Sequence, residues 1–318
     1  MTPRLPASLV ALSAAALVLA GCASGPQAPE SGKPQVVATT NVYGDIAEAI
    51  GGDDIEVTSL IRSLTQDPHA YEATARDRLA VSRADLVIAN GGGYDAFIDS
   101  LVAGTDAEVL TAVDTDDHHD HDHDHAEEEG HEGHSHDGNE HVWYEPHAMA
   151  ELATEIGEHL AEIDPDNAET YAANTEAFLA GLEEIEQGID DLAADHAGAG
   201  VFVTEPVPVL LLEAAGLENV TPPAFTEAVE EGQDVPPATL LEARSVLESG
   251  EVAAVIANAQ TGGAETTDVI QRAEALGIPV LEFTELLPDG LSYLEWMQRN
   301  VDDLTAALAA GPASTLSR

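Results

Sequence analysis

The sequence predicts an α/β protein in which two parallel-sheet domains are joined by one long central helix. Short β-type runs alternate with helix-spaced segments up to residue 164, and the same alternation resumes after residue 198. A single long helical stripe lies between the two regions. Alternating strands and helices are typical of parallel sheets covered on both faces. The chain beyond residue 34 is also longer than one hydrophobic core comfortably supports, which favours two domains.

The first domain is predicted over residues 35–164. Glycine pairs and runs mark the expected ends of its first helix and of its most apolar strand, because glycine readily takes turn conformations. The expected strands are Val36–Thr40, Ile55–Ile61 and Asp85–Asn90. The expected helices are Val42–Ile50, Ala73–Ser82 and Ala148–Leu160.

A connecting helix is predicted over residues 165–197, opened by Asp164-Pro165. One stripe recurs at alternating spacings of four and three residues, which is the signature of one helix face. Its members are Tyr171, Thr175, Phe178, Leu182, Ile185, Ile189 and Leu192. Such a helix would be about 45–50 Å long, so we expect it to join two domains. One helix of a bundle is the alternative, but it fits the flanking strands less well.

The second domain is predicted over residues 198–312. It repeats the alternation without a recognisable sequence repeat of the first. The expected strands are Gly200–Thr204, Val252–Asn258 and Ile278–Thr284. The expected helices are Val207–Ala215, Pro237–Ser249, Thr266–Leu276 and Tyr293–Ala310.

The N-terminus is typical of a secretory signal peptide, predicted over residues 1–21. Its apolar stretch, Leu9–Ala20, is too short to span a bilayer stably. It ends in Leu-Ala-Gly-Cys22, which resembles a bacterial lipobox, so we expect Cys22 to be lipidated; a buried thiol is the alternative. Residues 22–34 would be a flexible lipid-anchored linker. Because Cys22 is the only cysteine, an internal disulfide and a thiolate metal site are both excluded.

The charge balance excludes one class of partner. The formal net charge is −50, from 60 acidic and 10 basic residues. Nucleic-acid binding needs a basic face, which this composition does not offer. The same charge would repel anionic lipid headgroups, so membrane attachment is expected through the lipid anchor only. The charge would attract cations at low ionic strength, although solubility or a salty habitat would account for it as well.

Eight of the 13 histidines lie in a loop predicted over residues 117–137. Imidazole binds zinc, copper and nickel well, and the interleaved carboxylates are serviceable co-ligands. The segment has almost no apolar residues, so it is expected to be a loop that captures metal ions. A solvated acidic loop or an artificial tag is the alternative, although a tag would sit at a terminus. The residues assigned to auxiliary capture are His118, His119, His121, His123, His125, His131, His134 and His136.

Four further segments place a metal-competent side chain after a strand or at the start of a loop. They contain His69 and His141 in the first domain and Glu205 and Glu285 in the second. Ligands of open α/β sheets gather at the carboxyl ends of the strands. We therefore expect these side chains to converge in the cleft between the domains.

These motifs together resemble the metal-binding lipoproteins of ABC importers, the zinc and manganese substrate-binding proteins with a rigid interdomain helix. The resemblance covers roughly residues 36–308. It is carried by Asp67-Pro68-His69-Ala70-Tyr71-Glu72, by His141-Val142-Trp143 after the His-rich loop, by the long helix, and by the pattern from Ala257 to Met297. It implies that His69, His141, Glu205 and Glu285 are the metal ligands. It also implies an importer permease and ATPase as partners, and a monomer on the extracytoplasmic face of the membrane or in a periplasm.

The sequence departs from this family pattern just before the second histidine. Asn139-Glu140 stands where Asp-Pro is usual, which leaves His147, in Glu145-Pro146-His147, as a competitor for His141.

Two imidazoles and two carboxylates do not decide between zinc and manganese. The His-rich loop favours zinc, because dense imidazole suits zinc better, and the resemblance associates such loops with the zinc members. A manganese-binding protein of the same family and a metal buffer without a transporter are the alternatives. An enzyme is not expected. His131-Glu132-Gly133-His134 has the wrong spacing for a zinc hydrolase, and no nucleophile elbow or phosphate-binding loop is found.

Overall fold

The structure, a computed structural model, describes residues 32–113 and 138–311. The predicted signal peptide, Cys22 and all eight histidines of the predicted capture loop lie outside the described residues. In the part of the chain that is described, no helix is long and apolar enough to cross a membrane.

The N-terminal lobe (residues 34–113 and 138–163) is built on a four-stranded parallel sheet in the order β2-β1-β3-β4. Its strands are β1 Gln35–Thr40, β2 Glu56–Ile61, β3 Leu86–Gly91 and β4 Glu108–Val113. In β1 the side chains of Val36 and Ala38 join one buried cluster, and that of Val37 joins another. Successive side chains of the strand point to opposite faces of the sheet, and both faces are buried. The central strands are therefore continuous apolar runs.

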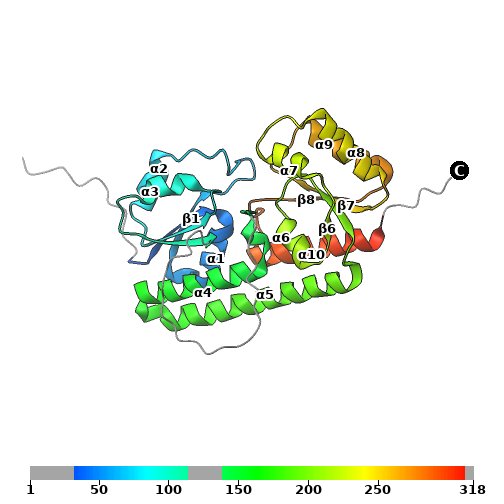
Figure 1. The fold of residues 1–318 in the computed structure, drawn as a ribbon. Coiled ribbons are helices and arrows are strands. Elements are labelled where there is room, and N and C mark those ends of the chain that lie inside the picture. Colours follow the sequence, from blue (N-terminus) through cyan, green and yellow to red (C-terminus); the bar gives the residue numbers. More distant parts are fainter. Residues whose placement is uncertain (1–31, 114–137, 312–318) are drawn as a thin grey trace, which may run out of the picture. The chain divides into compact units, whose positions relative to one another are not determined.

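Helices cover both faces of this sheet (Figure 1). The longer helices α1 and α4 pack on the face that bears Val36, and the shorter α2 and α3 contribute to the cluster that contains Val37. Their bounds are α1 Asn41–Gly51, α2 Ala75–Val81, α3 Asp99–Val102 and α4 Pro146–Ile163. Short 3₁₀ turns lie at Gly52–Asp54 (η1), Ala96–Ile98 (η2) and Val142–Tyr144 (η3).

The C-terminal lobe (residues 200–311) has a second four-stranded parallel sheet, in the order β6-β5-β7-β8. Its strands are β5 Gly200–Val203, β6 Glu218–Asn219, β7 Val252–Asn258 and β8 Val280–Phe283. Phe202 and Val255 point into one buried cluster with α7, α8 and α9, while Val201 and Ile256 belong to the cluster that includes α6 and α10. The helices are α6 Val209–Ala214, α7 Pro223–Glu230, α8 Pro237–Glu248, α9 Ala264–Leu276 and α10 Tyr293–Ala310.

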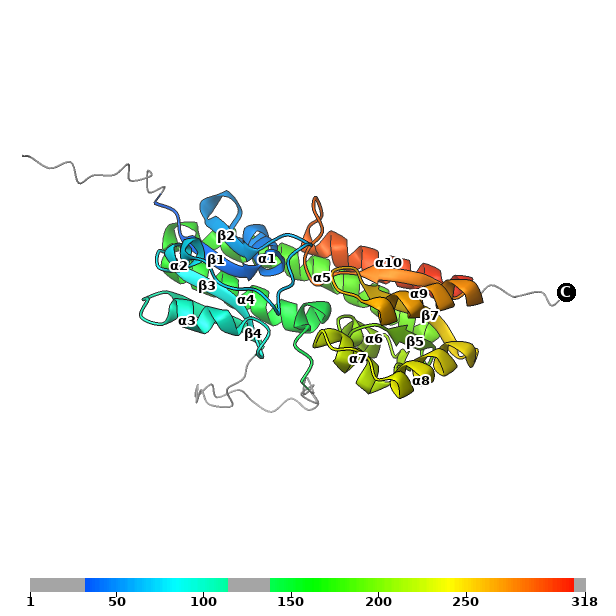
Figure 2. The same ribbon diagram turned by 90° about the horizontal axis from the view of Figure 1, so that it is seen from above.

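A long helix connects the lobes (Figures 1 and 2). A 3₁₀ turn, η4 Pro165–Asn167, leads into α5 Ala168–His196. All seven residues of the predicted stripe are buried, and α5 packs against α1 and α4 of the first lobe and α6 and α10 of the second. The predicted fold class, two parallel-sheet α/β domains joined by one long helix, is confirmed.

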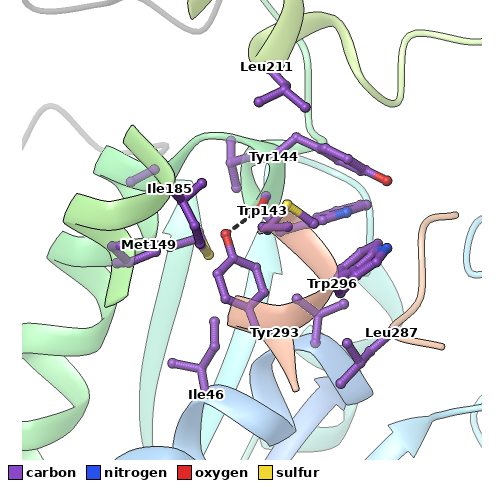
Figure 3. Close-up of a cluster of buried hydrophobic side chains, with 14 of the residues drawn as sticks. Ile46, Trp143, Tyr144, Met149, Ile185, Leu211, Leu287, Tyr293 and Trp296 are labelled. Carbon is purple, nitrogen blue, oxygen red and sulfur yellow. Dashed lines mark hydrogen bonds between the residues drawn. The ribbon is translucent and has the colours of Figure 1, made fainter. Parts of the chain in front are cut away.

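Where the lobes meet, they share one hydrophobic cluster rather than two separate ones. The aromatic side chains at its centre come from η3 and from the start of α10 (Figure 3). The hydroxyl of Tyr293 donates to the carbonyl of Trp143 at 2.7 Å, and that of Tyr144 donates to the carbonyl of Thr284 at 2.7 Å. Asn41 adds a pair of hydrogen bonds to the backbone of Leu287. The lobes are therefore tied by buried polar contacts in addition to α5.

Several short elements were not predicted. Strand β4 pairs with β3 at the edge of the sheet, and its residues are mostly exposed or half-buried, so its apolar pattern is weak. Helices α3 and α7 have only 4 and 8 residues. Such short segments carry too few periodic positions for a helix to be recognised. The end of α7 nevertheless reaches the candidate site described next.

Candidate metal site

The four predicted site residues come from both lobes. His69 lies in the loop after β2, and His141 immediately precedes η3. Glu205 and Glu285 lie two residues beyond the last residues of β5 and β8. The carboxyl ends of parallel strands open on the same edge of a sheet, so both glutamates face the same end of the C-terminal lobe.

Three of the four side chains are brought together. One ligand atom from each of His69, His141 and Glu285 lies within 4.8 Å of the other two. Nε2 of His69 is 3.6 Å from Oε2 of Glu285, and the two imidazole centroids are 6.0 Å apart. The side chain of Glu285 is fully buried, whereas that of His69 is 25% exposed. The three-residue group is therefore accessible to solvent on the side formed by His69.

Glu205 is buried beside this group but is not one of the three close residues. Asn258, at the end of β7, connects it to them. Its amide Nδ2 donates to Oε2 of Glu205 at 2.8 Å and to Oε1 of Glu285 at 2.6 Å. The hydroxyl of Thr261 donates to the other oxygen of Glu205. The two carboxylates are thus held side by side by one shared amide, which sequence reasoning did not identify.

The backbone of each histidine is fixed by the residue two positions earlier. The Asp67 carboxylate accepts from the backbone N–H of His69 at 3.0 Å, and the Asn139 side-chain carbonyl accepts from that of His141 at 3.0 Å. Asp and Asn favour such local bonds because their short side chains reach the backbone two residues on. The same local turn therefore presents both imidazoles.

The ring of His141 is oriented with one nitrogen free. Its Nδ1 lies 2.8 Å from Oδ1 of Asn139, whose Nδ2 donates to the carbonyl of Pro206 at 3.1 Å. That second bond fixes the amide orientation, so Nδ1 of His141 must be the donor. Its Nε2 is buried and has no hydrogen-bond partner among the described residues. Burial, with a smaller contribution from nearby His69, lowers the pKa of His141 to about 3, so the ring is neutral.

Glu285 is a buried carboxylate surrounded by hydrogen-bond donors. The hydroxyl of Tyr94 donates to its Oε2 at 3.1 Å, and the Gln260 side chain accepts from its backbone N–H at 2.8 Å. Burial, together with the charge of Glu205, raises the pKa of Glu285 to about 7, while the bonds from Asn258 and Tyr94 act in the opposite direction. A buried carboxylate is costly unless a positive charge compensates it.

Two more acids, not predicted as site residues, face the same place. Oε1 of Glu140 lies 3.2 Å from Nδ1 of His69, and Glu230 at the end of α7 completes a second group with them, again within 4.8 Å. Burial raises the pKa of Glu140. Burial raises the pKa of Glu230 to about 7, helped most by the charges of Glu140 and Glu205. Acidic side chains are therefore concentrated beside His69, and a bound cation would favour their ionised forms.

His147, the competitor for His141, is elsewhere. Its side chain is 68% exposed on α4, and its Nε2 lies 3.6 Å from Glu151 one helical turn later. The structure thus brings His141, and not His147, to His69.

The donor set suits a divalent cation. It offers neutral imidazole nitrogen, including one buried Nε2 that has no partner within the described chain, together with carboxylate oxygen. Nitrogen and oxygen donors of this kind bind zinc and other first-row transition metals.

Comparison with protein families gives one decisive match. The model of the family described as "Zinc-uptake complex component A periplasmic" matches residues 36–307, which is most of the chain. The chain belongs to this family. The family consists of substrate-binding proteins of ABC transporters and not of enzymes, which agrees with the prediction from the sequence.

Among characterised relatives, the manganese-binding lipoprotein MntA of Halalkalibacterium halodurans is 33% identical over 179 residues, 55% of this chain and 56% of that protein. The manganese ABC transporter substrate-binding lipoprotein PsaA of Streptococcus pneumoniae is 33% identical over 172 residues, 52% and 53% of the two chains. The chain spans about half the length of the curated relatives that it matches.

Solved structures share the fold. The periplasmic zinc-binding protein TroA of Treponema pallidum superposes with a TM-score of 0.68 at 18% identity, covering 87% of this chain and 99% of that one. The FpvC protein of Pseudomonas aeruginosa, in complex with Mn²⁺, gives 0.68 at 21% identity, covering 87% and 99%. At these identities the likeness establishes the fold alone.

Proposed function

We propose that this protein captures a divalent metal ion outside the cytoplasm and delivers it to an ABC importer, whose permease and ATPase are its partners. The observation that carries the proposal is the convergence of His69, His141 and Glu285, with a buried imidazole nitrogen left without a partner in the described chain. Membership of a zinc-uptake family supports the same conclusion. Attachment through lipidated Cys22, capture by the loop at 117–137 and a monomeric state belong to this proposal.

In the proposed site, His69 and His141 each contribute one ring nitrogen, and Glu285 contributes a carboxylate oxygen. Glu205 is the proposed fourth ligand and shares Asn258 with Glu285. Two carboxylates neutralise one divalent ion, and the neutral His141 adds no charge, so the buried charges would balance. The further acids Glu140 and Glu230 lie beside this balanced set.

We propose zinc as the ion, with manganese as the alternative. Paired imidazoles and a four-ligand nitrogen and oxygen set suit zinc. The relatives whose names mention manganese, and the extra carboxylates beside His69, favour manganese instead, because harder oxygen ligands suit that ion. Metal analysis of the protein purified from its own cells, followed by competition between the two ions, decides between them.

The ligand assignment is tested by alanine variants measured by isothermal titration with Mn²⁺, because manganese has the lower affinity for histidine-rich segments. H141A is expected to weaken binding by at least about 100-fold, since each lost ligand removes one coordination bond. H147A is the matched control, because it removes an exposed histidine only six residues away and should leave affinity unchanged. Equal losses in both variants, or a loss in H147A alone, would refute the assignment.

A further inference from the structure

The two residues that depart from the family pattern, Asn139 and Glu140, contact the two histidines of the proposed site. Oδ1 of Asn139 lies 2.8 Å from Nδ1 of His141, and Oε1 of Glu140 lies 3.2 Å from Nδ1 of His69. In both rings the contacted nitrogen is Nδ1. In each ring this leaves Nε2 for the site. Nε2 of His69 lies 3.6 Å from Oε2 of Glu285, and Nε2 of His141 has no hydrogen-bond partner among the described residues.

The backbone of Glu140 is firmly placed. Its carbonyl accepts a hydrogen bond from the side-chain amide of Asn90 at 3.0 Å. Asn90 is fully buried at the end of β3, and the hydroxyl of Tyr43 donates to its side-chain carbonyl. The carboxylate of Glu140 therefore approaches His69 from an anchored segment rather than from a free loop.

A neutral imidazole carries one N–H and one lone pair, so an acceptor at one nitrogen decides which nitrogen can bind a metal. An acceptor at Nδ1 keeps the proton there and leaves the Nε2 lone pair for the ion. A carboxylate in this position also makes the ring a stronger donor and limits its rotation.

We propose that Glu140 is a positioning residue for His69. Its carboxylate lies 3.2 Å from Nδ1, within reach of a hydrogen bond from Nδ1–H that would hold the imidazole in the tautomer whose Nε2 faces the proposed metal site. Proline, usual at this position in the pattern that the sequence resembles, has no side-chain acceptor and could not give this support. The inference rests on the proposed metal site, but its first test does not require metal.

The first test is the tautomer of His69 in metal-free protein. ¹⁵N chemical shifts of the imidazole, measured at a pH where the ring is neutral and assigned with H69N, should show protonated Nδ1 and unprotonated Nε2. E140A should move the proton toward Nε2, whereas E140Q should retain the wild-type tautomer because its amide oxygen still accepts. A His69 tautomer that is the same in wild type and E140A overturns the proposal.

The second test is Mn²⁺ affinity of the full chain by isothermal titration. E140A should weaken binding by about 10–100-fold, the usual effect of losing a partner of a metal-bound histidine, and E140Q should recover most of it. E151A is the matched control, because it removes the exposed Glu151 from His147 on α4. It should change neither affinity nor the His69 spectrum.

A direct ligand role for Glu140, shared with Glu230, is the competing assignment, and the same experiments separate the two. A direct ligand predicts that E230Q weakens Mn²⁺ binding as much as E140A and that E140Q gives no recovery. That pattern overturns the positioning role. Wild-type protein that shows the expected tautomer, but neither saturable Mn²⁺ binding nor Zn²⁺ binding that H141A weakens, refutes the proposed function and leaves the role of Glu140 in orienting His69 intact.

Discussion

At the scale of single residues, the site depends on one amide as much as on its charged groups. Asn258 donates to both Glu205 and Glu285 from a single Nδ2. Without it, two buried carboxylates would face each other with fewer donors between them. Removing the hydrogen-bond partner of a buried charged group costs more free energy than losing a typical hydrogen bond.

We therefore expect N258A to weaken metal binding by about 10-fold or more and to lower the melting temperature of the metal-free protein. The measurements are isothermal titration and thermal unfolding in the presence of a chelator. N300A is the control, because Asn300 is a buried asparagine on α10 outside the proposed ligand set. It should alter melting alone, and an affinity loss equal to that of N258A would contradict this role.

We expect Glu230 to make the stability of the metal-free protein depend on pH. Its pKa in the folded protein is raised to about 7, first by burial and then by neighbouring carboxylates, whereas an exposed glutamate has a lower pKa. The folded protein therefore binds this proton more tightly than the unfolded chain does. The protonated side chain stabilises the fold below the unfolded pKa, and this contribution is lost as pH rises through about 7.

E230Q removes this ionisation. In metal-free protein at pH 8 it should raise the melting temperature by about 2–4 °C, equivalent to roughly 1 kcal/mol, and at pH 5 the difference should vanish. E227Q removes a nearby acid one turn earlier on α7 and controls for net charge. A stabilisation by E230Q that persisted unchanged at pH 5 would show that the ionisation is not the cause.

The placement of the proposed ligands could be predicted from the sequence only in part. Glu205 and Glu285 follow apolar strands, and the rule that sites gather at strand ends located them. The proximity of Glu230 could not be predicted, because it depends on how a short helix, α7, packs against the lobe. Asn258 ends a correctly predicted strand, but an amide there gives no signal that it will bridge two carboxylates.

At the scale of elements, glycine determines how closely the long helices approach. A Cβ on Gly157 of α4 would lie 2.3 Å from Oγ1 of Thr175 on α5, and one on Gly181 of α5 would lie 2.5 Å from Leu294 on α10. Both contacts are too short for real atoms, so a side chain at either position must displace its neighbour. The buried stripe of α5 was predictable from its spacing, but the partners α4 and α10 were not.

G157V should consequently destabilise the protein by about 1–3 kcal/mol, the usual cost of overpacking a core, measured by chemical denaturation. The control A194V places the same side chain on an exposed position of α5 and should cost only the lower helix propensity of valine. Equal stability of the two variants would contradict close packing of α4 on α5.

At the scale of the whole described chain, the lobes are joined by more than a hinge. Tyr293 and Tyr144 each make a buried hydrogen bond to a backbone carbonyl of the other lobe. Asn41 makes a half-buried hydrogen bond to the carbonyl of Leu287. The α5 helix packs against both lobes. Wide opening would expose the shared hydrophobic cluster and break these bonds. We propose domain limits of 35–164 and 198–312 around the helix, with rigid coupling between them.

Metal binding should therefore produce small shifts rather than a wide closure. Small-angle X-ray scattering from chelator-treated and metal-loaded protein should give radii of gyration that agree within experimental error. A clear decrease on adding metal, of the kind produced by hinge closure of two domains, would show that the interlobe contacts break in the metal-free state.

The most direct test of the central claim is anomalous diffraction from crystals of the metal-loaded full chain. We predict one strong peak between the lobes, bonded to Nε2 of His69, Nε2 of His141 and a carboxylate oxygen of Glu285, with Glu205 completing the site. A region between the lobes without a peak, or an ion bound away from these side chains, would contradict the account.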